Sequence, residues 1–197
     1  PPNAVLPDRP TEPEHEVRAW DDHSEDERLL FARYKETYAA MVDNIDQNLG
    51  RLRAHLEMLG EWDNTIVLFT SDNGASREGQ TMGTAAYFRT LLGAARNTDE
   101  DFHQADLAQI DQIGGPQTMP HYPRGWAMAS NTPFRLYKVN AHHGGHQVPM
   151  VLSWPAGKVE PGIRHVYQHV TDVMATLVEL AGAQIPDSRN GVVGPKP

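Results

Sequence analysis

Two adjacent polar residues, Asp72 and Asn73, follow a short apolar run over residues 66–70 and are candidate metal ligands. A carboxylate and an amide carbonyl are hard oxygen donors, which suit Ca²⁺ or Mg²⁺ better than a soft metal. The same pair before Gly74 is also typical of an ordinary turn, in which the Asp or Asn side chain bonds to nearby backbone. Position favours a ligand site, because the apolar run predicts a buried parallel strand and ligands bind at the carboxyl ends of such strands.

A second candidate group begins at Lys138, which follows a predicted short strand over residues 134–138. A lysine at a strand end can hold a sulfate or phosphate as a point charge, although most lysines are simply solvated. Beyond it, two glycines separate His142 and His143 from His146. The zinc protease signature needs two histidines on one helical face with a glutamate between them, and glycines would interrupt that helix. The glycines instead let the backbone approach a neighbour closely.

The elements that must position these residues alternate between helix and strand. Ser24 and Glu27 form a capping box, and apolar residues recur every three or four positions behind it until Gly60, which predicts one long helix. A strand is predicted over residues 148–154, and a second amphipathic helix ends at Gly182. Helix followed by strand is typical of an α/β fold.

The composition of the chain limits the classes of partner that we expect for it. The formal net charge is −9, and no cluster of Lys and Arg offsets it, so nucleic acid is not an expected partner. No apolar run approaches the roughly 20 residues that span a bilayer, so no membrane segment is expected in this chain. There is no cysteine. Residues 96–133 have few apolar repeats and predict a long loop, which is usually functional or mobile.

Several motifs follow one another in a fixed order. They are Asp-Asn-Gly-Ala-Ser at 72–76 with Glu78-Gly79, Asn-Thr-Pro-Phe-Arg-Leu-Tyr-Lys at 131–138, His142-x-Gly-Gly, Val148-Pro149 and Ser-Trp-Pro-Ala-Gly at 153–157. Together these motifs resemble successive signatures of the bacterial type I sulfatases, the arylsulfatases of the alkaline-phosphatase-like superfamily. The resemblance implies an α/β fold with a mixed or parallel sheet flanked by helices.

The resemblance also implies roles for four residues. Asp72 and Asn73 match two ligands of the divalent cation at the active site, usually Ca²⁺, with Mg²⁺ as the alternative. Lys138 matches the lysine that contacts the substrate sulfate, and His142 matches a histidine close to the same site. The reaction attributed to the family is hydrolysis of a sulfate ester by a formylglycine nucleophile made from cysteine or serine. The metal and the cationic side chains stabilise the developing negative charge.

Part of that machinery is not found in this sequence. No Cys or Ser matches the nucleophile motif Cys/Ser-x-Pro-Ser/Ala-Arg, and two oxygen ligands cannot fill a Ca²⁺ shell of about six to eight. We therefore expect residues 24–183 to be the carboxyl-terminal part of a sulfatase catalytic domain. Residues 1–23 would be a loop continuing from an upstream part that carries the formylglycine, and residues 184–197 would begin a terminal subdomain. This chain alone is expected to be inactive, and to be poorly soluble or partly unfolded.

Two other functions stay open. One is a phosphodiester or phosphonate hydrolase of the same superfamily, whose members share Asp-Asn or Asp-His ligands. The other is a non-catalytic, sulfatase-like binding module. Asn73 and the Phe-Arg-Leu-Tyr-Lys string at 134–138 favour a sulfate ester as the small-molecule substrate. No residue pattern separates the bacterial cytoplasm from the periplasm as the compartment.

Overall fold

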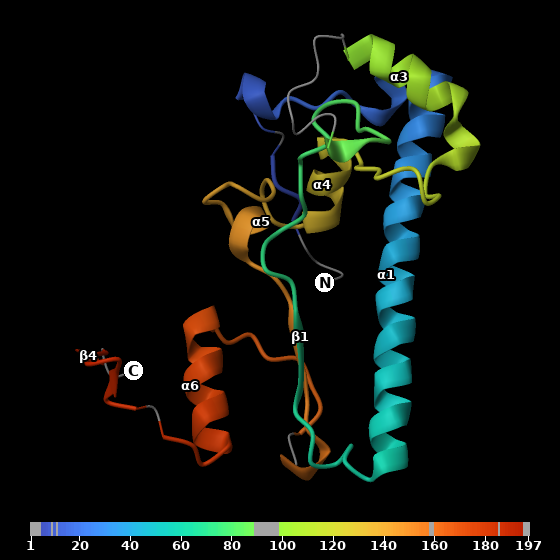
Figure 1. Cartoon of the computed structure of the whole chain (residues 1–197). Helices are drawn as coiled ribbons and strands as arrows, with labels where there is room; N and C mark the ends of the chain where they lie inside the picture. Colours follow the sequence, from blue (N-terminus) through green and yellow to red (C-terminus); the bar gives the residue numbers. More distant parts are fainter. Residues whose placement is uncertain are drawn as a thin grey trace. The chain divides into compact units, whose positions relative to one another are not determined.

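The computed structural model forms two compact units, Pro1–Val159 and Glu160–Pro197, which are described separately. The description covers residues 5–8, 10, 12–88, 99–157, 160–184 and 186–194. Side chains of residues 99–102 and 189 are outside it. Figure 1 shows the elements of both units in sequence colours.

The first unit contains one long helix, α1, Glu25–Leu59, which begins and ends where the sequence predicts (Figure 1). The Ser24 hydroxyl accepts a hydrogen bond from the Glu27 amide at 3.1 Å, and the Glu27 carboxylate accepts one from the Ser24 amide at 2.8 Å. This reciprocal box satisfies two of the otherwise unpaired amides of the first turn. Gly60 ends the helix with a φ of 74°, a left-handed conformation that glycine adopts without strain.

The core of this unit lies against the amino-terminal part of α1. Leu30, Phe31 and Tyr34 are each at most 3% exposed. They pack in one cluster with buried residues of later segments, namely Ala85, Ile113, Tyr122, Ala127, Leu136 and Tyr137. Farther along α1, Met41 and Ile45 continue the apolar stripe but are exposed. Only the first turns of the predicted stripe are therefore buried within the described residues.

Strands β1, Val67–Thr70, and β2, Met150–Ser153, pair antiparallel, with Thr70 opposite Met150. The prediction of a buried parallel strand is wrong on both counts, because the pairing is antiparallel and Phe69 and Val151 are 46% and 60% exposed. No third strand joins this sheet within the described residues. An apolar run predicts a strand suited to burial, but burial also needs layers on both faces. The described residues leave those faces open.

Helices occupy much of the region predicted to be a long loop. They are α3, Asp99–Ala108, the 3₁₀ turn Ile110–Gln112, and α4, Arg124–Asn131. A single buried carboxylate helps to fix α3, because Asp106 accepts hydrogen bonds from the Tyr34 hydroxyl at 2.7 Å and the Ala85 amide at 2.6 Å. The polar composition of α3 leaves no apolar helical period in the sequence, while a buried, hydrogen-bonded Asp docks the helix.

Two further predictions fail between α4 and β2. Residues 134–138 form turns, and Leu136 and Val139 have φ values of 61° and 79°, which an extended strand excludes. The two glycines do not interrupt a helix either, because His143–His146 forms the single helical turn α5. Short 3₁₀ turns complete the unit at Pro13–His15, Trp20–Asp22 and Pro155–Gly157.

The second unit contains helix α6, Val170–Leu180, and a two-stranded antiparallel pair, β3, Ser188–Arg189, with β4, Val192–Val193. The Asp172 carboxylate accepts a hydrogen bond from the His169 amide at 2.8 Å and caps α6. Apolar side chains of α6, including Val170 and Met174, are exposed. Across the described residues of both units, no helix combines the length and apolar character that a membrane crossing requires.

Candidate functional site

Two backbone hydrogen bonds join the loop after β1 to the segment that carries Lys138. The Gly74 amide donates to the Gly145 carbonyl at 3.0 Å, and the Lys138 amide donates to the Ala75 carbonyl at 3.0 Å. These bonds place Asp72 and Asn73 on a loop that is tied directly to Lys138. The structure thus brings together three of the four residues singled out in the sequence.

The side chain of Asn131, at the end of α4, braces the same two segments. Its Oδ1 accepts from the Ala75 amide at 2.9 Å, and its Nδ2 donates to the Leu136 carbonyl at 2.9 Å. One amide side chain therefore satisfies a donor on one loop and an acceptor on the other. A residue with only a donor or only an acceptor could not do both.

The glycines of α5 make this approach possible. A Cβ on Gly144 would overlap the Leu136 carbonyl oxygen, and a Cβ on Gly145 would overlap the Asn140 carbonyl oxygen. A Cβ on Gly74 would in turn overlap the carbonyl oxygen of Gly144. The expectation that these glycines permit a close backbone approach is confirmed.

Gly145→Ala should therefore lower the free energy of unfolding of the complete protein by about 1–3 kcal/mol, because backbone atoms must move apart to admit the methyl group. Gly50→Ala is the matched control. Gly50 lies inside α1 with open space around it, so alanine there should raise stability by about 0.5–1 kcal/mol. Urea denaturation of both variants checks the pair, and similar effects at the two positions would contradict the crowding argument.

Lys138 is paired with an acid that was not among the predicted site residues. Its ammonium donates to Glu78 Oε1 at 2.9 Å, and Glu78 Oε2 accepts from the Ser76 hydroxyl at 2.9 Å and the Tyr87 hydroxyl at 3.2 Å. The hydrogen bond from Lys138 lowers the pKa of Glu78, and the bond to Glu78 raises the pKa of Lys138. The charge of Asp72 raises the pKa of Lys138 further. Both partners of the pair are therefore ionised at neutral pH.

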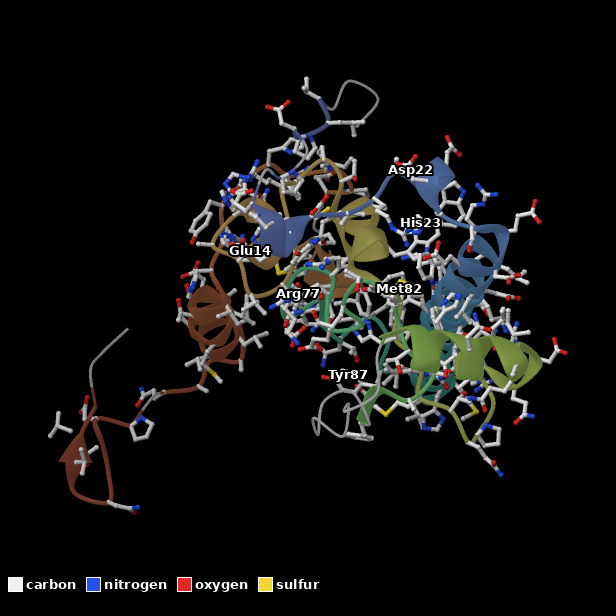
Figure 2. The ribbon with its side chains drawn as sticks, turned by 90° about the horizontal axis from the view of Figure 1, so that it is seen from above. Glu14, Asp22, His23, Arg77, Met82 and Tyr87 are labelled. Carbon is white, nitrogen blue, oxygen red and sulfur yellow. The ribbon has the colours of Figure 1, made fainter. Side chains whose placement is uncertain are left out.

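His121 lies against the other side of this group. Its Nε2 is 3.0 Å from the Ser76 hydroxyl, and its ring stacks on Tyr87 with centroids 5.6 Å apart and planes 30° apart. Burial lowers the pKa of His121, which favours a neutral ring at pH 7. Figure 2 labels Arg77, Met82 and Tyr87, which belong to the segment over residues 76–87 that carries Ser76 and Glu78.

Asp72 and Asn73 present oxygen atoms suited to a hard cation. Asp72 is exposed, and Asn73 is half-buried with its Nδ2 donating to the Gly74 carbonyl at 2.9 Å. Because the amide nitrogen is engaged there, the Asn73 Oδ1 is the atom available as a ligand. The donor types fit Ca²⁺ or Mg²⁺. In the part of the chain that the structure describes, no group of three or more His, Cys, Asp or Glu residues is placed to hold a metal ion. As ligands, these two residues would fill only part of a Ca²⁺ shell of about six to eight oxygen atoms.

His142 lies at the start of α5, where its carbonyl accepts a hydrogen bond from the Gly145 amide at 2.8 Å. It precedes α5, is exposed, and lines a cavity of about 360 Å³ together with Phe134 and Arg135. No described hydrogen bond or ion pair joins its ring to Asp72 or Lys138. The role of His142 in the site stays a prediction.

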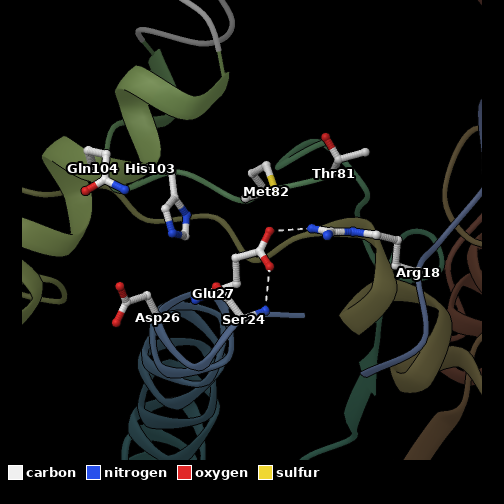
Figure 3. A pocket seen from close by; sticks show the side chains of 8 residues that line it. All are labelled: Arg18, Ser24, Asp26, Glu27, Thr81, Met82, His103 and Gln104. Carbon is white, nitrogen blue, oxygen red and sulfur yellow. Dashed lines mark hydrogen bonds and ion pairs between the residues drawn. The ribbon is translucent and has the colours of Figure 1, made fainter. Parts of the chain in front are cut away.

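A larger cavity, of about 560 Å³, lies at the amino-terminal end of α1 (Figure 3). It is lined by Arg18, Ser24, Asp26, Glu27, Thr81, Met82, His103 and Gln104. Burial would raise the pKa of Glu27, but the Ser24 amide and the Arg18 guanidinium outweigh it and hold that pKa at about 2. The charged pair at this cavity thus serves the cap of α1. It shares no residue with the loop of Asp72 or with Lys138.

The sequence profile of the family described as Sulfatase matches residues 5–183. The chain belongs to the sulfatase family. An uncharacterized sulfatase of Schizosaccharomyces pombe is 31% identical over 170 residues, which cover 86% of this chain and 29% of that protein. An arylsulfatase of Klebsiella aerogenes is 29% identical over 170 residues, covering 84% and 33%. A steryl-sulfatase of Mus musculus is 30% identical over 155 residues, covering 77% and 18%.

This sulfatase chain therefore spans about a third or less of the length of the curated relatives named above. Membership confirms the resemblance that the ordered motifs indicate, and the fold is a sulfatase domain of mixed α/β type with a small antiparallel sheet. The site residues that the sequence did not assign are Glu78, Tyr87 and His121. Glu78 is part of one of the motifs, so it could have been considered. Tyr87 and His121 stand in no motif and have no sequence signal.

Proposed function

We propose that this sulfatase chain is the carboxyl-terminal part of the catalytic domain of an arylsulfatase-type sulfate ester hydrolase. The observation that carries the proposal is the hydrogen bond from the Lys138 amide to the Ala75 carbonyl, at 3.0 Å, just after the Asp72-Asn73 pair. This bond connects the segment that carries the Lys138 ammonium to the loop that carries the two hard oxygen ligands, and we call these two connected segments the frame. Sulfate carries negative charge on several oxygens, and such a frame can meet it with a metal ion on one side and an ammonium on the other.

The residues of the frame have separate tasks in this proposal. Asp72 and Asn73 hold a divalent cation, Ca²⁺ or Mg²⁺, which supplies Lewis-acid polarisation of the sulfate when bound. Lys138 has three N–H donors, uses one on Glu78, and keeps two for sulfate oxygens. His142, four positions later, is the second candidate cation. The other metal ligands and the formylglycine nucleophile are contributed by residues outside this chain, since two oxygen ligands are too few for the cation and no Cys or Ser of this sequence matches the nucleophile motif.

The complete protein tests the substrate class directly. We expect it to hydrolyse p-nitrophenyl sulfate with a higher kcat/KM than bis-p-nitrophenyl phosphate or an aryl phosphonate. Asn73 and the Phe-Arg-Leu-Tyr-Lys string at 134–138 favour a sulfate ester, and a sulfate monoester offers three terminal oxygens to the cation and to Lys138 where a phosphodiester offers two. The reverse order would assign the chain to a phosphodiester or phosphonate hydrolase of the superfamily. Absence of every activity, together with absence of the nucleophile motif from the complete protein, would assign it to a non-catalytic binding module.

The isolated 197-residue chain should be inactive and self-associated. The exposed Phe69 and Val151 on β1 and β2, and Met41 and Ile45 on α1, leave apolar surface in water that a second copy can cover. Size-exclusion chromatography and thermal unfolding check this, with the complete protein as the control. A monomeric elution volume together with a sharp cooperative melt would contradict the prediction.

A further inference from the structure

The Glu78 carboxylate is held by three side chains rather than by Lys138 alone. Ser76 and Tyr87 donate to one carboxylate oxygen at 2.9 and 3.2 Å, and Lys138 donates to the other at 2.9 Å. Glu78 and Lys138 are 60 residues apart in the chain. The acid therefore belongs to a fixed network on the loop after β1, and the lysine joins it from another segment.

An ordinary surface ion pair would not need that support. The side chains of Lys138 and Glu78 are 32% and 35% exposed, a range in which a simple pair adds little stability. A carboxylate close to a sulfate-binding ammonium also repels the sulfate, so its presence is unfavourable for anion binding as such. The fixed Glu78 carboxylate is best explained by its effect on the position of the Lys138 ammonium.

Lys138 needs such a restraint because of its side chain. Four rotatable bonds separate its ammonium from the backbone, and fixing them costs conformational entropy. The backbone of Lys138 is already fixed by its hydrogen bond to Ala75. With the ammonium held by Glu78 at the other end, both ends of the side chain are tied while two N–H donors stay available.

We propose that Glu78 is a positioning residue for Lys138, which holds the ammonium beside the loop of Asp72 and Asn73 so that it meets the substrate sulfate without reordering. The inference rests on the proposed function and deepens it. Ser76 and Tyr87 act one step further away, by keeping the Glu78 carboxylate in place.

A double-mutant cycle in the complete protein tests this role. Glu78→Gln should lower kcat/KM for p-nitrophenyl sulfate by about 10–100-fold and raise the inhibition constant of inorganic sulfate, because the ammonium is no longer held. In the Lys138→Ala background, Glu78→Gln should change either quantity by less than about twofold, since nothing is left to position. An equal factor in both backgrounds would overturn the inference, because a merely structural role gives that result.

Two further variants keep the test decisive. Tyr87→Phe removes one support of Glu78 and leaves the ion pair, so it should give a smaller loss in the same direction, again absent in the Lys138→Ala background. It replaces Glu78→Gln if that variant does not fold. Glu57→Gln is the matched control, since Glu57 pairs with Arg53 at 2.8 Å on the exposed side of α1, and it should leave activity unchanged.

The outcomes separate this inference from the proposed function. If Lys138→Ala leaves hydrolysis and sulfate inhibition unchanged, Lys138 does not bind sulfate and both proposals fail. If Lys138→Ala is impaired while Glu78→Gln has no effect on the wild-type background, the proposed function stands and the role of Glu78 fails.

Discussion

Replacing Asp72 by alanine should abolish sulfate ester hydrolysis by the complete protein, with kcat falling at least about 1,000-fold. The reason is that Asp72 is the charged member of the proposed ligand pair, because its partner Asn73 contributes a neutral carbonyl oxygen. Loss of that charge weakens the site for a hard cation and removes the polarisation of the sulfate. Titration calorimetry with Ca²⁺ should show weaker binding in parallel with the loss of turnover on p-nitrophenyl sulfate.

Asp63 provides the matched control for this experiment. It is an exposed aspartate before β1, whereas Asp72 follows the same strand, so Asp63→Ala removes an equal charge from the other end of one element. We expect that variant to keep both Ca²⁺ affinity and kcat. Near-normal hydrolysis by Asp72→Ala would remove Asp72 from the metal site.

Lys138→Ala should lower kcat/KM for an aryl sulfate by about 100–1,000-fold, because the sulfate loses the ammonium that the backbone bond to Ala75 and the pair with Glu78 hold near the proposed metal ligands. Ca²⁺ affinity should not fall, since removal of a positive charge near Asp72 does not disfavour cation binding. Steady-state kinetics and calorimetry on the same preparation separate the two effects. Lys138→Arg keeps the charge but changes its shape, so partial activity is expected.

Arg51→Ala is the control for loss of a positive charge, because Arg51 lies on the exposed part of α1. It should leave kcat/KM unchanged. A fall in Ca²⁺ affinity in Lys138→Ala would contradict the separation of roles, since it would mean that the lysine supports the metal site itself.

Local signals in the sequence predicted local structure well. Ser24, Glu27 and Gly60 determine the ends of α1 through hydrogen bonds within a few residues, so the sequence contains all that is needed. The β1–β2 pairing joins segments that are distant in sequence, and the apolar pattern alone did not reveal its antiparallel sense or its exposure. α3 was missed because its docking depends on one buried acid, Asp106, rather than on an apolar stripe.

The same difference between local sequence signals and contacts between distant segments applies to the candidate site. Asp72, Asn73 and Lys138 could be selected because they belong to ordered motifs, and the backbone bonds between their segments put them in one place. His142 belongs to the same ordered motifs, and its role in the site stays a prediction. The network of Ser76, Tyr87 and His121 around Glu78 could not be foreseen, because it depends on turns and ring stacking that have no period in the sequence.

The backbone hydrogen bonds that tie the loop after β1 to the segment of Lys138 affect how such a site can evolve toward different substrates. These bonds use main-chain atoms of Gly74, Ala75, Lys138 and Gly145, so they do not depend on the side chains of the stretch between Ala75 and Lys138. In the proposed sulfatase, substitutions in that stretch that spare the supporting side chains of Glu78, Tyr87 and Asn131 can therefore reshape the substrate entrance for different alcohols while these bonds hold Lys138 beside the loop of Asp72. Selection for new sulfate esters would then change the residues around the site and leave the residues proposed to bind the sulfate unchanged.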